Sequence, residues 1–188
     1  MNEHRIFFTA IFTDELQLPY NDLVNYVKRT KEANNSTNMS NVGGWQSPYY
    51  SIFDMEPPMT LVHDAVVSKA THVFQKYNIS RNAKLTNYWF NINKKYNYNA
   101  PHSHLRTTLS AVLYLKVPSN SGDLVIHNPA PQFSGFPDAP NQYNTSLYKL
   151  TPTVGKLVMF SSDIVHSVSQ NLTEDEDDER ISIAFDFD

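Results

Sequence analysis

The chain contains no cysteine among its 188 residues. This absence excludes a disulfide framework, zinc sites built from thiolates and catalysis by a cysteine nucleophile. Positive charge is also scarce, because 15 Lys and Arg residues stand against 19 Asp and Glu residues and the net charge is −4. We therefore expect no nucleic-acid partner, since nucleic-acid-binding proteins carry a basic surface that attracts phosphates.

Long hydrophobic runs are missing as well. No segment approaches the roughly 20 apolar residues that a membrane-spanning helix needs, and the first eight residues lack the basic and apolar regions of a secretory signal. We expect a cytoplasmic protein with no membrane association. The hydrophobic content of 40% favours a single globular domain over residues 1–188 with a core of its own.

The first 83 residues predict a strand and two supporting helices. Hydrophobic patterning indicates a strand over residues 5–12 and a helix over residues 21–28. Apolar residues three and four apart predict a second helix, which Thr60 caps and which continues to Phe74. We expect these helices to lie against a sheet.

Residues 84–188 show a different pattern, in which short β-like runs are separated by turn signals. Such spacing is typical of two packed sheets. The sequence predicts a mainly β fold with flanking helices, a double-stranded β-helix of the jelly-roll or cupin-like kind, with its metal-binding barrel in this region.

Three histidines form a candidate metal site. Side chains two apart on an extended strand project to the same face, so His102 and His104 can converge on one ion. His166 follows another apolar, β-rich stretch, which could deliver a third ligand. Imidazole suits iron, zinc, copper or nickel, so the ligand type leaves the metal open. Asp123, and less favourably Asp163, are alternatives to His104 as the remaining ligand.

The last strand carries a second signal, because bulky apolar residues alternate strictly with polar or small ones. The apolar set is Ile181, Ile183, Phe185 and Phe187, and the other set is Arg180, Ser182, Ala184 and Asp186. If the second set faces the barrel interior, Arg180 is buried and needs a partner, because an unpaired buried guanidinium is costly. A dicarboxylate would pair with Arg180 through a bidentate fork and with Ser182 through its hydroxyl. The alternative is an ion pair between Arg180 and the acidic run 174–179.

Taken together, these motifs resemble the 2-oxoglutarate and Fe(II)-dependent oxygenases, and most closely the small phage-type members of that superfamily. The matching segments are His102–His104 before the strand 111–115, the Gly-containing segment 121–129, residues 152–160, His166, the Arg-x-Ser of residues 180–182, and upstream the segments 43–47 and 89–91. The resemblance covers most of the chain, best from about residue 84 onward. One departure concerns His104, since the commonest triad of the superfamily has two histidines and one carboxylate.

The resemblance implies an enzyme that uses Fe(II), 2-oxoglutarate and oxygen to hydroxylate a C–H bond, with release of succinate and carbon dioxide. The implied site residues are His102, His104 and His166 for the metal, Arg180 and Ser182 for the far carboxylate of 2-oxoglutarate, and Asn91 and Tyr114 as further hydrogen-bonding partners of that cosubstrate. The substrate could be peptidyl, for example prolyl, or a small molecule. A homodimer is compatible with an exposed edge strand.

Two other functions fit parts of the pattern. A cupin-like metalloenzyme would use three histidines without 2-oxoglutarate, but such sites tend to carry a further Glu soon after the histidine pair, and residues 105–110 contain none. A non-catalytic barrel module would have no reason to keep both the metal ligands and a buried cation at Arg180.

Overall fold

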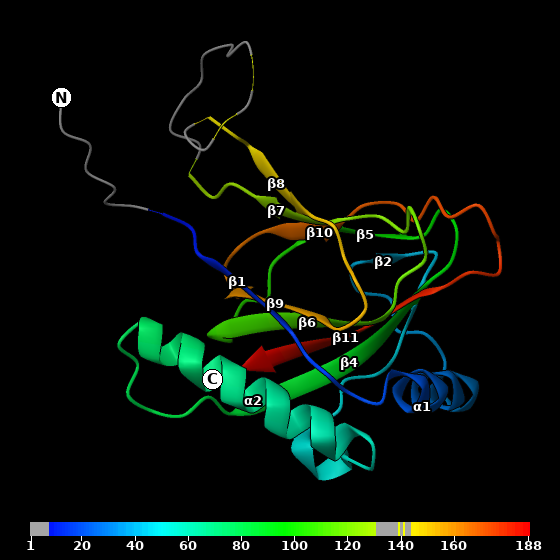
Figure 1. Cartoon of the computed structure of the whole chain (residues 1–188), viewed down its shortest axis with the longest axis horizontal. Helices are drawn as coiled ribbons and strands as arrows, with labels where there is room; N and C mark the ends of the chain where they lie inside the picture. Colours follow the sequence, from blue (N-terminus) through cyan, green and yellow to red (C-terminus); the bar gives the residue numbers. More distant parts are fainter. Residues whose placement is uncertain (1–7, 131–138, 140, 142–143) are drawn as a thin grey trace.

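The computed structural model describes residues 8–130, 139, 141 and 144–188. Two antiparallel sheets face each other, and both helices lie against the larger sheet (Figure 1). The helices are α1 (Tyr20–Ala33) and α2 (Met59–Lys76), with a short 3-10 turn η1 (Ile52–Asp54) before α2. The strands are β1 (Ile11–Glu15), β2 (Asn41–Val42), β3 (Trp45–Gln46), β4 (Leu85–Asn93), β5 (Tyr98–His102), β6 (Leu109–Lys116), β7 (Leu124–His127), β8 (Leu147–Leu150), β9 (Lys156–Ser161), β10 (His166–Val168) and β11 (Arg180–Phe187).

The larger sheet has the strand order β1-β9-β6-β11-β4-β3, and the smaller sheet has the order β2-β5-β10-β7-β8. The last strand of the chain, β11, therefore lies in the middle of the larger sheet, where it pairs with β4 and β6. This arrangement confirms the predicted mainly β jelly roll with flanking helices. Among the described residues, neither helix combines the length and the apolar character that crossing a membrane requires.

The two faces of β11 have the separate roles that its alternating sequence predicts. The four apolar side chains of β11 belong to the main hydrophobic core together with buried residues of both helices. These helix residues are Leu23, Val27, Met59, Val62, Val66, Ala70, Val73 and Phe74. Each buried Val, Leu, Ile, Met or Phe side chain of this core contributes about 1.5–3 kcal/mol. The apolar face of β11 therefore anchors the fold, which leaves the opposite face to line the space between the sheets.

The predicted helices and first strand are present with shifted boundaries. The first helix begins one residue before the predicted range and continues to Ala33, and the second extends two residues beyond Phe74. The prediction that Thr60 caps this helix was wrong, because the helix starts at Met59 and Pro58 precedes it without a side-chain cap. Proline suits this place because a helix start needs no N–H donor there.

The first strand begins later than predicted. Residues 5–7 of the predicted strand lie outside the described residues, and β1 itself spans Ile11–Glu15. Its range is set by antiparallel pairing with β9 from Ile11 opposite Phe160 to Glu15 opposite Lys156. The pairing partner therefore decides where this edge strand lies.

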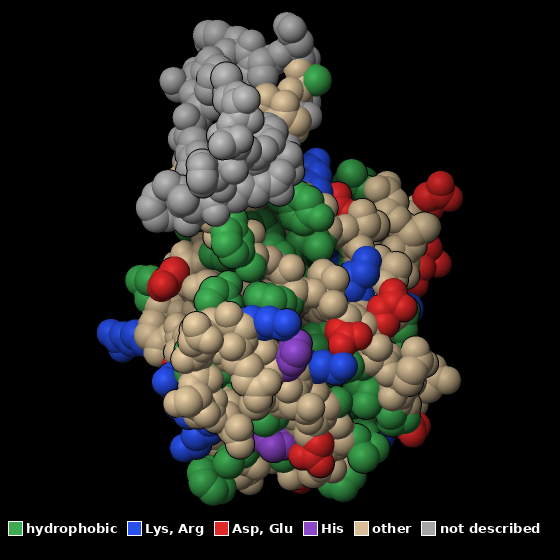
Figure 2. Space-filling model, turned by 60° about the vertical axis from the view of Figure 1, so that its left-hand side comes forward, with side chains coloured by type: hydrophobic (Ala, Val, Ile, Leu, Met, Phe, Trp, Pro, Cys, Tyr) green, Lys and Arg blue, Asp and Glu red, His purple; other side chains and the backbone are tan. Residues whose placement is uncertain are grey.

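Charged side chains on the surface are mixed in sign. On the face shown in Figure 2, Lys and Arg side chains are scattered among Asp and Glu side chains, and uncharged atoms make up most of the described area. This mixture agrees with the net charge of −4 and gives that face no continuous basic patch of the kind that nucleic acid attracts.

Candidate metal centre

Pairing between two strands of the smaller sheet brings the histidines together. His102 ends β5, His166 begins β10, and the two residues are direct partners in the antiparallel register of these strands. His104 lies two residues beyond β5, where its backbone N–H donates a hydrogen bond of 2.9 Å to the carbonyl oxygen of Ser162. This bond holds the loop after β5 against the end of β9.

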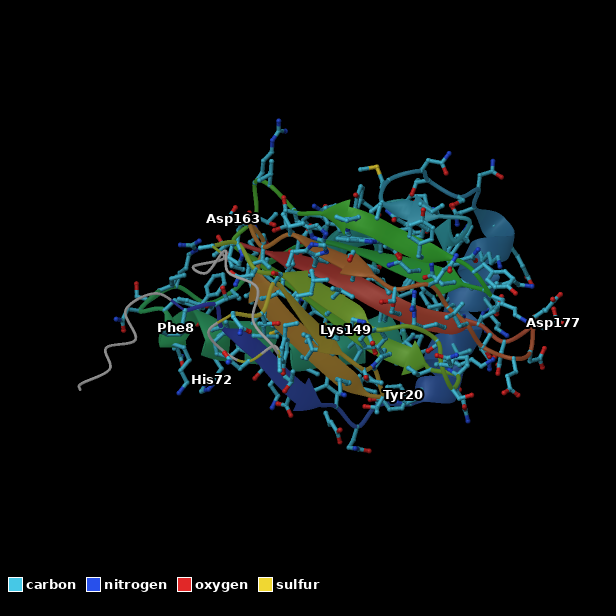
Figure 3. The ribbon with its side chains drawn as sticks, turned by 90° about the horizontal axis from the view of Figure 1, so that it is seen from above. Phe8, Tyr20, His72, Lys149, Asp163 and Asp177 are labelled. Carbon is cyan, nitrogen blue, oxygen red and sulfur yellow. The ribbon has the colours of Figure 1, made fainter. Side chains whose placement is uncertain are left out.

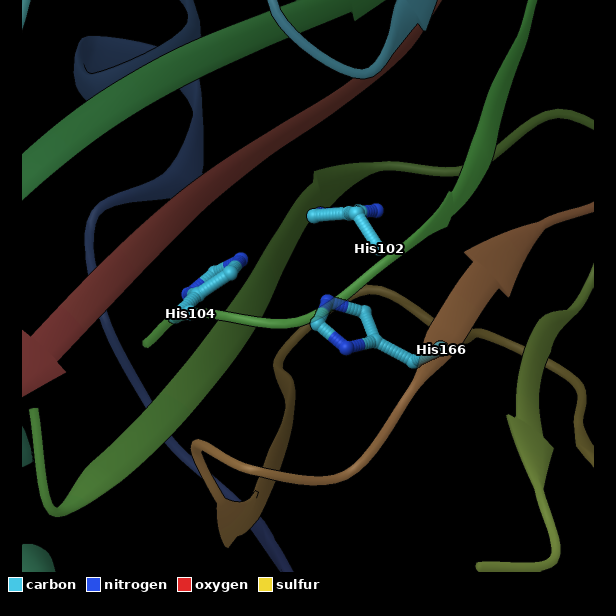
Figure 4. A group of neighbouring side chains, drawn as sticks. All are labelled: His102, His104 and His166. Carbon is cyan, nitrogen blue, oxygen red and sulfur yellow. The ribbon is translucent and has the colours of Figure 1, made fainter. Parts of the chain in front are cut away.

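The three imidazole rings face one another (Figure 4). The ring centroids are 4.3 Å apart for His102 and His166, 5.1 Å for His102 and His104, and 5.0 Å for His104 and His166. One nitrogen from each ring lies within 4.8 Å of the others. This group could hold a single metal ion, and imidazole is a ligand that iron accepts.

Hydrogen bonds at the backs of the rings select which nitrogen faces the centre. Nδ1 of His102 lies 2.8 Å from the carbonyl oxygen of Ala100, and Nδ1 of His166 lies 3.0 Å from that of Ile164. A carbonyl oxygen only accepts, so each Nδ1 carries the proton and each Nε2 keeps its lone pair. This is the tautomer that a metal ligand needs when the metal binds at Nε2.

His104 is held differently, by a carboxylate. Its Nδ1 lies 2.7 Å from Oδ1 of Asp186 and 2.9 Å from Oγ of Ser110, and Ser110 also donates to Asp186 over 2.9 Å. Neither Asp186 nor Ser110 was predicted to belong to the site. The available signal was position, because Asp186 shares the inward face of β11 with Arg180 and Ser182.

Burial keeps two of the rings neutral. Desolvation lowers the pKa of His102, and desolvation together with the neighbouring His102 ring lowers the pKa of His166 to about 3. Both rings are therefore unprotonated at neutral pH. Neutral imidazole is the form that binds metal, so no proton needs to leave these two rings when an ion enters.

The two aspartates that the sequence offered as alternative ligands do not join the histidine group. Within the described part of the chain, that group consists of His102, His104 and His166. Asp163 is exposed, and Figure 3 shows it at the opposite end of the molecule from Asp177 of the acidic run. Asp123 lines a separate surface hollow beside the segment 151–154. The geometry favours His104 over both.

The predicted cosubstrate residues line the same cavity as the histidines. Asn91 on β4, Ser182 on β11 and Tyr114 on β6 are register partners and form a row across the larger sheet. Arg180 lies two residues from Ser182 on the same face of β11. The cavity is lined by these residues and the three histidines, together with Ser40, Trp89, Asn93, Asn99, Ser110, Ala111, Val112, Leu124, Phe160, Val168 and Ala184.

Arg180 is buried, and its guanidinium is mostly unpaired. It is 2% exposed, and among the described residues its side chain makes one hydrogen bond, from Nη1 to the carbonyl oxygen of Ser121. Burial lowers the pKa of Arg180 and raises the pKa of its neighbour Tyr114 to about 12. A guanidinium has five N–H donors. Most of these donors are available to an anion in the cavity.

The acidic run does not pair with Arg180. Its carboxylates contact lysines instead, with the pairs Glu179–Lys28, Glu179–Lys31, Asp178–Lys116, Asp177–Lys94 and Glu176–Lys95. No ion pair of Arg180 is present in the described part of the chain. The alternative reading of Arg180 as a partner of the acidic run is therefore wrong.

Solved structures with the same fold include several oxygenases. A prolyl-4-hydroxylase from Pseudomonas putida is 18% identical with a TM-score of 0.68, covering 95% of this chain and 92% of that chain. A viral collagen prolyl hydroxylase from Paramecium Bursaria Chlorella virus-1, solved with 2-oxoglutarate, is 13% identical with a TM-score of 0.61, covering 94% of each chain. HygX from Streptomyces hygroscopicus, solved with nickel, 2-oxoglutarate and hygromycin B, is 14% identical with a TM-score of 0.61, covering 95% and 82%.

Sequence comparison gives the family directly. No curated protein matches the chain. Residues 87–186, which span β4 to β11 and contain all seven predicted site residues, match the family described as "Putative 2OG-Fe(II) oxygenase". The fold, the family match and the histidine group agree, and the chain belongs to the 2OG-Fe(II) oxygenase family.

Proposed function

We propose that the protein is an Fe(II)- and 2-oxoglutarate-dependent oxygenase that hydroxylates a C–H bond of a peptidyl or small-molecule substrate. Family membership and the group of three histidines support this function. The observation that carries it is the buried Arg180. Its guanidinium makes one hydrogen bond among the described residues and faces the same cavity as the histidines. A cavity with both features suits a cosubstrate that is a metal chelator at one end and a carboxylate at the other.

The histidines would hold Fe(II) through Nε2 of His102, His104 and His166. Their Nδ1 atoms are already hydrogen-bonded, so the rings need little reorientation when the ion binds. Bound iron and 2-oxoglutarate supply the activation of oxygen, with release of succinate and carbon dioxide. The protein's own contribution is to fix the ligands in space and to keep the centre between two sheets, away from bulk water.

The far carboxylate of 2-oxoglutarate would bind Arg180. A bidentate pair would use donors that make no hydrogen bond within the described protein, and burial strengthens such a charge-assisted contact. The hydroxyl of Ser182 lies on the same face of β11, and its register partners Asn91 and Tyr114 offer an amide and a phenol. These four residues would set the orientation of the cosubstrate relative to the metal.

We also propose that the chain is one domain, in which residues 1–83 support the barrel of residues 84–188. Segments 43–47 and 89–91 support its place in the phage-type subgroup that they resemble. Structural relatives include enzymes named for prolyl substrates and one solved with hygromycin B, so we propose the reaction for both peptidyl and small-molecule substrates. The underused Arg180 favours 2-oxoglutarate over a cupin-like reaction that does without it.

The test is an anaerobic titration of the Fe(II)-loaded protein with 2-oxoglutarate, followed by the visible charge-transfer absorption of a 2-oxo acid chelated to ferrous iron. We expect this band to appear, and to require a much higher 2-oxoglutarate concentration in Arg180→Ala. The matched control is Arg29→Ala, which removes an exposed arginine on α1. Bound iron without a band would contradict the use of 2-oxoglutarate, and absence of iron binding would contradict the metal site.

A further inference from the structure

We infer that Asp186 supplies the metal centre with the negative charge that its three neutral ligands lack, acting through the ring of His104. The inference deepens the proposed function and rests on its metal site. It assigns Asp186 as a positioning residue, since its carboxylate contacts the back of a ligand ring and not the ion itself.

The buried carboxylate of Asp186 has no Lys or Arg partner among the described residues. The residue is 7% exposed, and among the described residues its side chain forms no ion pair with Lys or Arg. Among the described residues, its carboxylate accepts hydrogen bonds from Nδ1 of His104 and from the hydroxyl of Ser110. A buried carboxylate is costly unless charge or hydrogen bonds compensate it. A divalent ion on Nε2 of His104 would provide that compensation across the ring.

The net charge of the metal centre supports the same role for Asp186. A divalent ion held by three neutral imidazoles keeps both of its positive charges, whereas a carboxylate ligand would remove one. Asp186 restores one negative charge at the back of His104. An imidazole whose Nδ1–H donates to a carboxylate is also a more basic ligand at Nε2, so Asp186 strengthens the metal bond of that ring.

Only one of the three rings is held in this way. The Nδ1 atoms of His102 and His166 donate to backbone carbonyls, which are uncharged. His104 is also the ligand at which the chain departs from the commonest triad of two histidines and one carboxylate. The carboxylate of Asp186 therefore lies behind His104, the one ring that replaces a charged ligand with a neutral one.

A chain of hydroxyls fixes the carboxylate in place. Oγ1 of Thr107 donates to Oγ of Ser162 over 2.9 Å, Ser162 and Ser110 are 2.8 Å apart, and Ser110 donates to Asp186. Because Asp186 only accepts, the protons of this chain run toward it. Such a directed network holds the negative charge and the ring of His104 in one arrangement.

The first test measures metal binding alone. Apo protein is titrated with Co(II) against a competing chelator, and azide is then titrated into the Co(II)-loaded protein while the visible absorption of Co(II) is followed. We expect Asp186→Asn to weaken Co(II) binding by about 10- to 100-fold, the usual effect of losing a hydrogen-bonding partner of a metal ligand. We also expect azide to bind more tightly, because the centre has become more positive. If Asp186 had a merely structural role, Asp186→Asn would weaken the binding of both Co(II) and azide.

The matched control is Asp188→Asn. Asp188 lies two residues further along the chain, and its carboxylate accepts hydrogen bonds from the backbone and hydroxyl of Thr108, away from the metal ligands. We expect Co(II) and azide affinities close to those of the parent. Equal losses in both variants would assign the effect to the C-terminal strand as a whole and overturn the inference.

A double-mutant cycle tests whether the effect passes through His104. In the H104D background the ring is gone, so adding Asp186→Asn should change Co(II) affinity by only a few-fold, well below its effect in the parent.

Ser110→Ala is a second variant, which keeps the charge of Asp186 and removes one hydrogen-bond donor. It should weaken Co(II) binding slightly without strengthening azide binding. A parent protein that binds no Co(II) would overturn the metal site and this inference together. Normal Co(II) and azide binding in a folded Asp186→Asn protein would overturn this inference alone.

Discussion

Strand β11 carries polar side chains in two regions of its inward face, and the two regions differ in how fully those side chains are hydrogen-bonded. Near Asp186, the carboxylate, the ring of His104 and the hydroxyl of Ser110 all bond one another. Near Arg180, the guanidinium makes one hydrogen bond, and the buried hydroxyl of Ser121 makes none among the described residues. A satisfied network is rigid, whereas unsatisfied buried donors are costly unless a ligand pairs with them. The first region is arranged to hold an ion, and the second is arranged to receive an anion.

Removing a metal ligand should have the largest effect. His166→Ala deletes one of three converging nitrogens, and we expect stoichiometric Fe(II) binding to be lost, as measured by metal analysis after anaerobic loading and desalting. His72→Ala is the control, since this histidine is exposed on α2. Retention of one iron per chain in His166→Ala would remove His166 from the ligand set.

Replacing the planar guanidinium of Arg180 with an ammonium group should have the next largest effect. Arg180→Lys keeps the charge but loses the planar fork, and a hydrogen bond to a charged group is worth about 1.5–3 kcal/mol. We expect the dissociation constant of 2-oxoglutarate to rise roughly 12- to 160-fold by anaerobic titration, with Fe(II) binding unchanged. An unchanged constant would show that the fork of Arg180 does not contact the cosubstrate.

Ser182→Ala should have a smaller effect on the same equilibrium. One neutral hydrogen bond contributes about 0.5–1.5 kcal/mol, so the dissociation constant of 2-oxoglutarate should rise roughly 2- to 12-fold. Ser119→Ala, at an exposed position in the loop after β6, provides the comparison. Equal constants for the two variants would exclude Ser182 from the binding of 2-oxoglutarate.

The opposite face of β11 should have the least influence on the site. Ile183→Ala removes a fully buried core side chain, and we expect the free energy of unfolding to fall by about 2–5 kcal/mol in urea titrations. Affinities for Fe(II) and 2-oxoglutarate should change little in the folded protein. A loss of ligand affinity as large as that of Arg180→Lys would show that the two faces of the strand are not independent.

The sequence predicted those parts of the site that depend on local alternation. The period of two along β11 places Arg180 and Ser182 on the inward face. The spacing of His102 and His104 predicted convergent rings on one strand, whereas β5 ends at His102 and a backbone hydrogen bond to Ser162 holds His104 in the loop that follows. The apolar stretch around His166 indicated a strand that could carry a ligand, although its pairing with β5 is a property of the folded sheet.

The parts that escaped prediction depend on contacts between distant segments. Asp186 and His104 are separated by 82 positions, and alternation alone places Asp186 inside the barrel without showing which ring it meets. The boundary of β1 is likewise set by its partner β9. Tertiary pairing therefore determined what local patterns left open.

A crystal structure of the protein with Ni(II) and 2-oxoglutarate, the ligands present in the HygX structure, would test the proposed centre most directly. We expect one ion bound by Nε2 of His102, His104 and His166, with the far carboxylate of 2-oxoglutarate paired to Arg180 and the Nδ1 of His104 still on Asp186. An ion held by Asp123 or Asp163, or 2-oxoglutarate bound away from Arg180, would contradict it.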